Sequence, residues 1–222
     1  LAEDEINGDT SSVVEMFQTL DGYPELFQKA FGSDIVTFTN IEKAIAQFVR
    51  TLITANSPFD QYLRGEKQLS QSELNGFVLF TTEEGADCFH CHGGGGNPLF
   101  TTHLFYNNGK EVINDPMDRL FISGDPMDYG AYKASSLRNI EYQKPYMHDG
   151  RFETLEEVIE FYSHSVQMTP YINPLMHHVN DNGVQLTATE KADLLNFIRS
   201  LNDEEFVTNP EFSKPSSFPD EK

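Results

Sequence analysis

The motif Cys88-Phe89-His90-Cys91-His92 is the feature that most constrains what this chain can fold into. It contains both cysteines of the 222-residue chain, so the pair acts as one local device and not as part of a disulfide framework. C-x-x-C-H is the attachment signature of c-type haem, because two thiols at this spacing reach the two vinyl groups of one porphyrin and the next histidine lies under the iron. The motif therefore predicts a covalent haem anchored by Cys88 and Cys91 and ligated by His92.

Three other roles for the cysteine pair stay open at this point. The first, a buried reduced pair, would not explain the histidine that follows. A thioredoxin-like redox pair opens a helix after a strand, whereas here the pair runs into four glycines, residues 93–96, which do not open a good helix. A structural zinc site needs a fourth ligand. His90 or His103 could supply that ligand, but no second C-x-x-C pair supports this reading.

Four stretches of the chain carry the same signal for the start of a helix, a Ser or Thr followed three residues later by Glu. Such a pair can form a capping box, which satisfies backbone N–H groups that the helix itself leaves unpaired. Apolar residues then follow at helical spacing in each stretch. The four pairs are Thr39 with Glu42, Ser70 with Glu73, Thr154 with Glu157 and Thr187 with Glu190.

Two weaker helices are expected at residues 11–20 and 24–31. Residues 93–150 differ, because Gly, Asn, Asp and Pro dominate there and no helical period lasts. A compact domain rarely carries so long an irregular stretch, and wrapping a large rigid cofactor is one reason for it. We therefore predict a mainly α fold in which long irregular loops surround the haem.

Composition and charge exclude several classes of partner. The chain is 38% hydrophobic with 18 Phe residues, enough for a packed core. Its net charge is −20, so nucleic acid and anionic lipid, which need clustered Lys and Arg, are not expected partners. The acidic surface would steer a basic protein towards it, although solubility explains the charge equally well. No run approaches the roughly 20 apolar residues that span a bilayer, so no membrane span is expected.

Beyond the haem motif, the chain carries an ordered series of characteristic segments, namely "IEKAIAQFVRTL", "SPFDQYLRGE", "LSQSELNGFVLF", "CFHCH", "SSLRNI", "KPYMHDGRFETLEEVIEFY" and "LTATEKADLLNFIRSL". This series resembles the bacterial di-haem cytochrome c peroxidase family, which includes the MauG-type enzymes, and the resemblance covers about residues 11 to 202. The segments "PYMHDGRF" and "FD.YL.G" are far more specific than the haem motif. The resemblance implies a cytochrome c-like haem domain with long irregular loops around the haem.

The resemblance implies a domain organisation. The family has two cytochrome c-like domains, an amino-terminal one with the peroxidatic haem and a carboxy-terminal one that passes electrons to it. This chain has one haem motif, which matches the second domain. We expect residues 1–38 to be connector helices from an absent amino-terminal haem domain, 39–208 to be the haem domain and 209–222 to be an extended tail. The chain would then be a piece of a longer protein.

The same resemblance implies the function. We expect a cytochrome c peroxidase-like oxidoreductase that reduces hydrogen peroxide to water, with electrons from a small redox protein, either a cytochrome c or a copper protein. This chain alone would lack the peroxidatic haem. The alternatives are MauG-like oxidation of a protein substrate and a mono-haem electron carrier with no catalysis of its own. The implied location is the periplasm, and a homodimer is one assembly open to such a protein.

The ligand on the far side of the iron is the main open question about the site. The resemblance implies Met in the peroxidases and Tyr in the MauG-type enzymes at a position that falls here on Tyr162. Tyr162 shares a helical face with Leu155, Val158 and Ile159, so it is expected to point inward. The alternative sixth ligand is Met168.

Four other site residues follow from the resemblance or from side-chain chemistry, together with Glu5 near the amino terminus. By resemblance, Glu5 in "DEIN" would be an acid/base residue, and Gln143 and Pro145 would hold a calcium ion through neutral oxygens. From their chemistry, Arg138 could donate to a haem propionate and Tyr146 could pack against the porphyrin.

Overall fold

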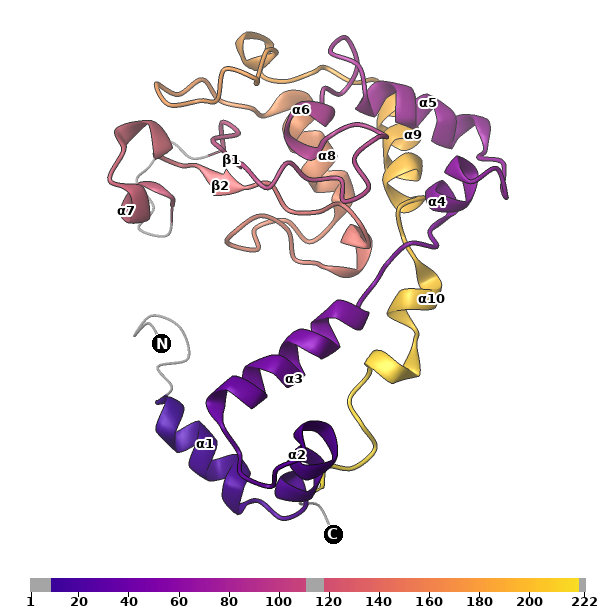
Figure 1. Ribbon diagram of the computed structural model, residues 1–222. Helices are drawn as coiled ribbons and strands as arrows, with labels where there is room; N and C mark the ends of the chain where they lie inside the picture. Colours follow the sequence, from indigo (N-terminus) through magenta and orange to yellow (C-terminus); the bar gives the residue numbers. More distant parts are fainter. Residues whose placement is uncertain (1–8, 111–117, 220–222) are drawn as a thin grey trace. The chain divides into compact units, whose positions relative to one another are not determined.

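The computed structural model describes residues 9–110 and 118–219. Helices are the main regular structure in both ranges, as Figure 1 shows. The chain divides into two compact units, Leu1–Ile53 with Phe206–Lys222 and Thr54–Glu205. The predicted haem domain, 39–208, began earlier than the second unit does. The difference arises because the helix after residue 37 packs with the helices before it and belongs to the first unit.

The first unit is built on three helices, α1 (Thr10–Thr19), α2 (Tyr23–Phe31) and α3 (Phe38–Thr51). These correspond to the two weaker predicted helices and the first strong one. Their small core buries Phe27, Val36 and Ile41. Towards the carboxy terminus the chain forms α10 (Glu204–Val207), and a 3₁₀ turn, η4 (Pro210–Phe212), interrupts the predicted extended tail.

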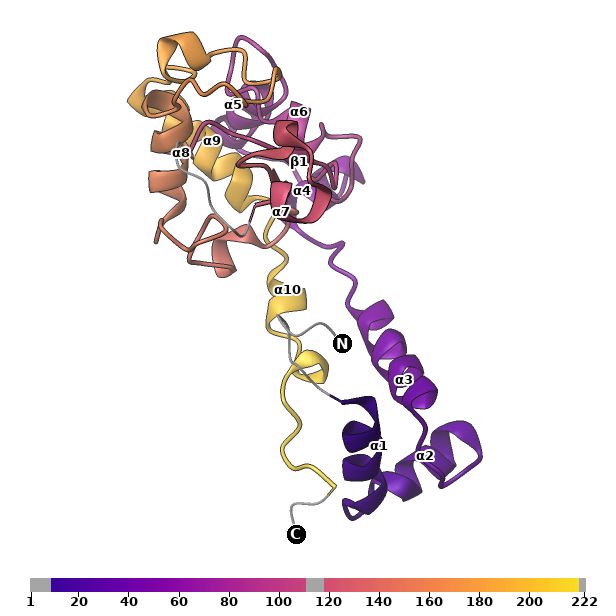
Figure 2. The same cartoon turned by 90° about the vertical axis from the view of Figure 1, so that its left-hand side faces the viewer.

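The second unit contains the remaining elements, joined by long irregular segments as predicted. Its helices α8 and α9 lie next to each other in the two views of Figure 1 and Figure 2. The elements in chain order are α4 (Pro58–Leu63), α5 (Gln71–Phe80), α6 (Phe89–His92), β1 (Phe105–Tyr106), α7 (Leu120–Ser123), η1 (Pro126–Asp128), β2 (Tyr132–Lys133), η2 (Ile140–Tyr142), α8 (Leu155–His164), η3 (Val179–Asp181) and α9 (Ala188–Arg199).

Three of the four predicted capping boxes are present, those that begin α5, α8 and α9. The prediction for Thr39 was wrong, because α3 starts from Thr37, whose side chain accepts a hydrogen bond from the backbone N–H of Asn40. A further capping box, Ser57 with Asp60, begins α4. The search pattern missed it because the acid there is Asp and not Glu.

Helices α5 and α9 form the closest helix pair of the second unit and lie side by side in Figure 1. Gly76 makes this approach possible, since a Cβ atom there would lie 2.0 Å from the carbonyl oxygen of Asp193. Around this pair lies a core rich in aromatic rings, with Phe59, Phe80 and Phe197 fully buried. This core forms one wall of the cavity described below.

The irregular stretch 93–150 contains a two-stranded antiparallel sheet in which Phe105 pairs with Lys133 and Tyr106 with Tyr132. None of the helices in the described ranges is long and apolar enough to cross a bilayer.

Candidate functional site

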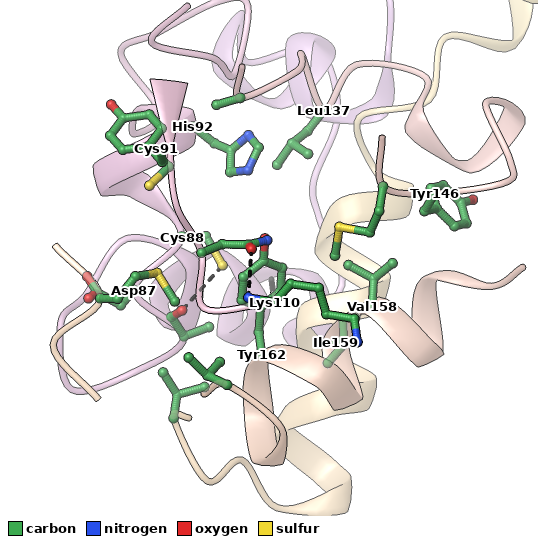
Figure 3. A pocket seen from close by; sticks show the side chains of 18 of the residues that line it. Asp87, Cys88, Cys91, His92, Lys110, Leu137, Tyr146, Val158, Ile159 and Tyr162 are labelled. Carbon is green, nitrogen blue, oxygen red and sulfur yellow. Dashed lines mark hydrogen bonds between the residues drawn. The ribbon is translucent and has the colours of Figure 1, made fainter. Parts of the chain in front are cut away.

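A cavity of about 510 Å³ lies within the second unit, a volume in the usual range for cofactor pockets. Its walls come from the α6 turn, the β1–β2 region, residues 143–148, α8 and α9. Most of the lining is apolar, as Figure 3 shows for Leu137, Val158 and Ile159. Such a space suits a large flat ligand that binds mainly by burial.

The haem motif forms a single helical turn at the edge of this cavity. Cys88 stands at the start of α6, and its carbonyl oxygen accepts a hydrogen bond from the His92 backbone N–H at 3.0 Å. Residues three and four apart share one face of a helix, so Cys88, Cys91 and His92 point the same way, and all three line the cavity. Gly93, with φ of 73°, ends the turn immediately after the histidine.

His92 is held in the orientation that a metal ligand needs. Its Nδ1 lies 3.1 Å from the carbonyl oxygen of Ser135. A carbonyl only accepts hydrogen bonds, so Nδ1 carries the proton and Nε2 presents its lone pair. Burial lowers the pKa of His92, against the opposing effect of hydrogen bonds to the Ser135 and Phe100 backbone. The imidazole is therefore neutral, as metal binding requires.

The two thiols do not resemble a redox pair or a zinc site. Burial raises the pKa of both Cys88 and Cys91 to about 12, whereas reactive C-x-x-C pairs have a lowered thiol pKa. Neither suggested fourth zinc ligand joins the two cysteines, because no group of three potential metal ligands in the described part of the chain contains a cysteine. His90 bonds Asp87, with Nδ1 at 2.6 Å from Oδ1, and His103 is exposed and outside the lining.

Tyr162 lies on α8 and reaches the cavity on the side away from His92 (Figure 3). Its hydroxyl oxygen accepts a hydrogen bond from Asn108 Nδ2 at 2.9 Å. Burial raises the pKa of Tyr162 to about 12, although the Asn108 hydrogen bond acts in the opposite direction. Met168, the alternative ligand, is 57% exposed and outside the cavity lining. Ligation by Tyr162 stays a prediction, while the position of Met168 in this structure argues against it as a ligand.

Arg138 has a different role from the one predicted. It is buried, and its Nη1 and Nη2 donate to the two carboxylate oxygens of Asp60 at 2.8 and 2.6 Å, while Nε donates to the carbonyl of Pro98. With its donors used in this way, the guanidinium does not line the cavity. Burial opposes ionisation of Asp60, yet hydrogen bonds from Arg138 and Ser57 hold its pKa below the ordinary value. Arg138 is a structural residue that joins two of the segments used for the family resemblance.

The remaining predicted residues have mixed outcomes. Tyr146 is buried and lines the cavity, as a porphyrin-packing ring should. Gln143 and Pro145 also line it, and the Gln143 side-chain amide donates to the Arg138 carbonyl at 3.2 Å. Calcium at these two positions stays a prediction. Glu5 lies outside the described residues.

Among the polar cavity residues that sequence reasoning missed are Asn108, Lys110 and Lys133. All three come from the irregular stretch, where no period indicates which side chains point inward. Lys110 also lies 5.6 Å from the centre of the Phe161 ring. The two lysines line a cavity otherwise mostly apolar, so they are suited to anionic groups at the edge of a bound ligand.

The residues present fit a covalently attached haem. Two thiols and a neutral imidazole share one face of a helical turn, and a mostly apolar cavity of adequate size opens in front of them. The cationic side chains Lys110 and Lys133 suit the two propionates. No zinc or redox-disulfide reading accounts for all of these features together.

Comparisons with known proteins place the chain among relatives of one kind. A family model described as di-haem cytochrome c peroxidase matches residues 1–68. The chain is 42% identical to a cytochrome c551 peroxidase of Nitrosomonas europaea over 142 residues, which is 62% of this chain and 41% of that protein. It is 32% identical to the methylamine utilization protein MauG of Methylophilus methylotrophus over 199 residues, 89% of this chain and 57% of the relative.

Solved structures agree with these matches. The crystal structure of a MauG-like protein associated with microbial copper homeostasis superposes with a TM-score of 0.78 at 35% identity, covering 97% of this chain and 69% of that one. The diheme peroxidase BthA from Burkholderia thailandensis superposes with a TM-score of 0.68 at 18% identity, covering 96% of this chain and 62% of that one, and shows the shared fold alone. The chain spans about half the length of the curated relatives it matches.

Proposed function

Because the chain belongs to the di-haem cytochrome c peroxidase and MauG family, we propose that it is the carboxy-terminal, electron-transfer haem domain of a peroxidase that reduces hydrogen peroxide to water. The observation that carries the proposal is the shared orientation of Cys88, Cys91 and His92 into one cavity. The family is one of oxidoreductases with covalently bound haem c. The role of this particular domain is the part that we propose.

The chain's own residues would hold and isolate the cofactor. Cys88 and Cys91 would anchor it, and His92 would ligate it in the orientation fixed by the Ser135 carbonyl. Ile159, Leu194 and the other apolar wall residues would exclude water. When bound, haem supplies a one-electron redox centre whose potential depends on its axial ligands and surroundings.

The overall reaction would take place at the second haem, in the amino-terminal domain that we place before this chain. One hydrogen peroxide, two electrons and two protons give two waters. This domain would relay the electrons one at a time from a small cytochrome c or copper protein. The net charge of −20 favours a donor with a basic docking patch. Covalent haem attachment in this family favours the periplasm as the location.

A second candidate is MauG-like oxidation of a protein substrate, and the position of Tyr162 favours it. A phenolate ligand favours the ferric and higher oxidation states of iron, whereas a thioether favours the ferrous state. The exposure of Met168 leaves Tyr162 as the better placed of the two predicted ligands. A Tyr-ligated domain would share oxidising equivalents with its partner haem instead of serving as a high-potential entry port.

Optical spectroscopy of the mature protein tests both candidates. A Soret band that survives acid–acetone extraction would establish the covalent haem. Tyr162→Phe is expected to change the ferric spectrum, and Met168→Leu, the matched control, is expected to leave it unchanged. If Met168→Leu alone alters the spectrum, the Tyr162 assignment is wrong.

Turnover of the full-length protein separates the reactions. Peroxide consumption that depends on a reduced cytochrome or copper protein would support the peroxidase. Peroxide-dependent oxidation of a co-purifying protein would support the MauG-like alternative. A full-length protein with no second haem motif and no peroxide turnover would leave only the mono-haem electron carrier.

A further inference from the structure

A second group of potential metal ligands lies beside the haem motif. Glu83, His90 and His177 each offer one ligand atom, and these atoms all lie within 4.8 Å of one another. The three residues come from the turn after α5, from α6 and from the segment before η3. Neither cysteine nor His92 belongs to the group, although His177 lines the same cavity as they do.

Asp87 holds both imidazoles. Its side chain is only 6% exposed, and its Oδ1 lies 2.6 Å from His90 Nδ1 while its Oδ2 lies 3.4 Å from His177 Nδ1. A carboxylate in this position favours the proton on each Nδ1 and leaves each Nε2 with a lone pair. A carboxylate behind a histidine is the usual arrangement that orients metal-binding imidazoles in proteins. Figure 3 shows Asp87 beside Cys88 at the edge of the cavity.

The distances within the group suit an ion better than direct bonds. His90 Nε2 lies 3.6 Å from Glu83 Oε1, too far for a good hydrogen bond. Two ligands on a tetrahedral ion with bonds of about 2.1 Å would lie about 3.4 Å apart. The His90 and His177 rings meet edge to face with their centres 5.2 Å apart.

A separate hydrogen bond holds the segment that contains His177 in place. His178 Nε2 donates to the backbone carbonyl of Glu83 at 2.7 Å, since a carbonyl only accepts. This bond ties the segment with His177 to the residue that supplies the carboxylate. The positions of the metal ligands are therefore set by the fold before any ion binds.

We propose that Glu83, His90 and His177 bind one divalent transition-metal ion, of the Zn²⁺ or Cu²⁺ type, with Asp87 as the positioning residue behind the two histidines. Imidazole and carboxylate ligands suit these ions. Three protein ligands leave a further coordination position for water or a small anion. The ion would join the haem-attachment turn to residues 176–179, which line the cavity, and so would clamp its edge.

Zn²⁺ is the appropriate first probe, because it does not exchange electrons with haem. Calorimetric titration of the haem-loaded protein with Zn²⁺ is expected to show one equivalent bound. His177→Asn and Glu83→Gln should abolish that equivalent, and Asp87→Asn should weaken it about 10–100-fold. The matched control is His164→Asn, a histidine that faces a single carboxylate, Glu160, at 3.1 Å, and it should bind as the parent does.

Haem content of Glu83→Gln, measured by the pyridine haemochrome spectrum, should stay at the parent level, because Glu83 lies outside the cavity lining. A second readout needs no variant: Cu²⁺ added to the parent protein should give an electron paramagnetic resonance signal with coupling to two imidazole nitrogens. Equal Zn²⁺ affinity in all variants, no stoichiometric binding, or a Cu²⁺ signal without nitrogen coupling would each overturn the proposal.

Discussion

On the His92 side of the cavity, the two thiols and the imidazole come from five consecutive residues and one helical turn. On the Tyr162 side, the phenol comes from α8 and its hydrogen-bond donor Asn108 stands 54 positions earlier in the chain. The first side is fixed by local geometry, and the second is assembled by the fold. A change in the motif should therefore abolish covalent haem attachment altogether. A change on the Tyr162 side should alter stability and the ferric spectrum only partly.

The largest effect should come from the motif itself. Replacing both cysteines, Cys88→Ser with Cys91→Ser, removes every thiol of the chain, so no thioether can form. We expect complete loss of covalent haem, measured by haem staining after denaturing electrophoresis. His103→Ser, at an exposed position outside the cavity lining, should keep the stain. Persistent covalent haem in the double variant would refute attachment through Cys88 and Cys91.

The next largest effect should come from the ion pair that supports the His92 side from a distance. Arg138 follows closely after Ser135, whose carbonyl orients His92, and Asp60 anchors that arginine. Asp60→Asn should lower the free energy of unfolding by about 3–5 kcal/mol, because it leaves a buried arginine without its partner. Urea denaturation measures this. Glu66→Gln, which breaks the exposed pair with Arg64, should produce no measurable change.

The same pair gives a pH dependence. Hydrogen bonds from Arg138 and Ser57 hold the pKa of Asp60 below its ordinary value of 3.8. A depressed pKa stabilises the folded state above pH 3.8, and that stabilisation is lost as the pH falls through the folded-state pKa. The parent should therefore lose stability in this acid range more steeply than Asp60→Asn does. If curves of the free energy of unfolding against pH run parallel for the parent and Asp60→Asn, Asp60 is excluded as the titrating group.

The smallest effect should come from the Tyr162 side. Asn108→Leu removes the donor to the Tyr162 hydroxyl and should cost about 0.5–1.5 kcal/mol, the usual net value of one hydrogen bond. It should also shift the ferric spectrum if Tyr162 ligates iron. Asn75→Leu, which removes a surface hydrogen bond to Asp193, should leave the spectrum unchanged. A spectrum insensitive to Asn108 would separate Tyr162 from the iron.

The helices could be predicted where their signals are local. The capping boxes of α5, α8 and α9 lie within four consecutive residues, so the sequence is sufficient to find them. The start of α3 was misplaced because Thr37 and Thr39 both suit a cap, and only the backbone conformation selects Thr37. Helical spacing also does not say what covers a face: Ile45 and Val49 on α3 are 59% and 56% exposed.

The sequence by itself determined the haem-binding turn, because residues at spacings of three and four share one helical face whatever surrounds them. It also identified Tyr162 as an inward-facing residue of α8. Only the tertiary structure decided that Arg138 pairs with Asp60, 78 positions away, that Met168 stays at the surface, and that Glu83, His90 and His177 converge. Such pairings are chosen among many chemically suitable partners by the packing of the whole unit, and no local spacing records that choice.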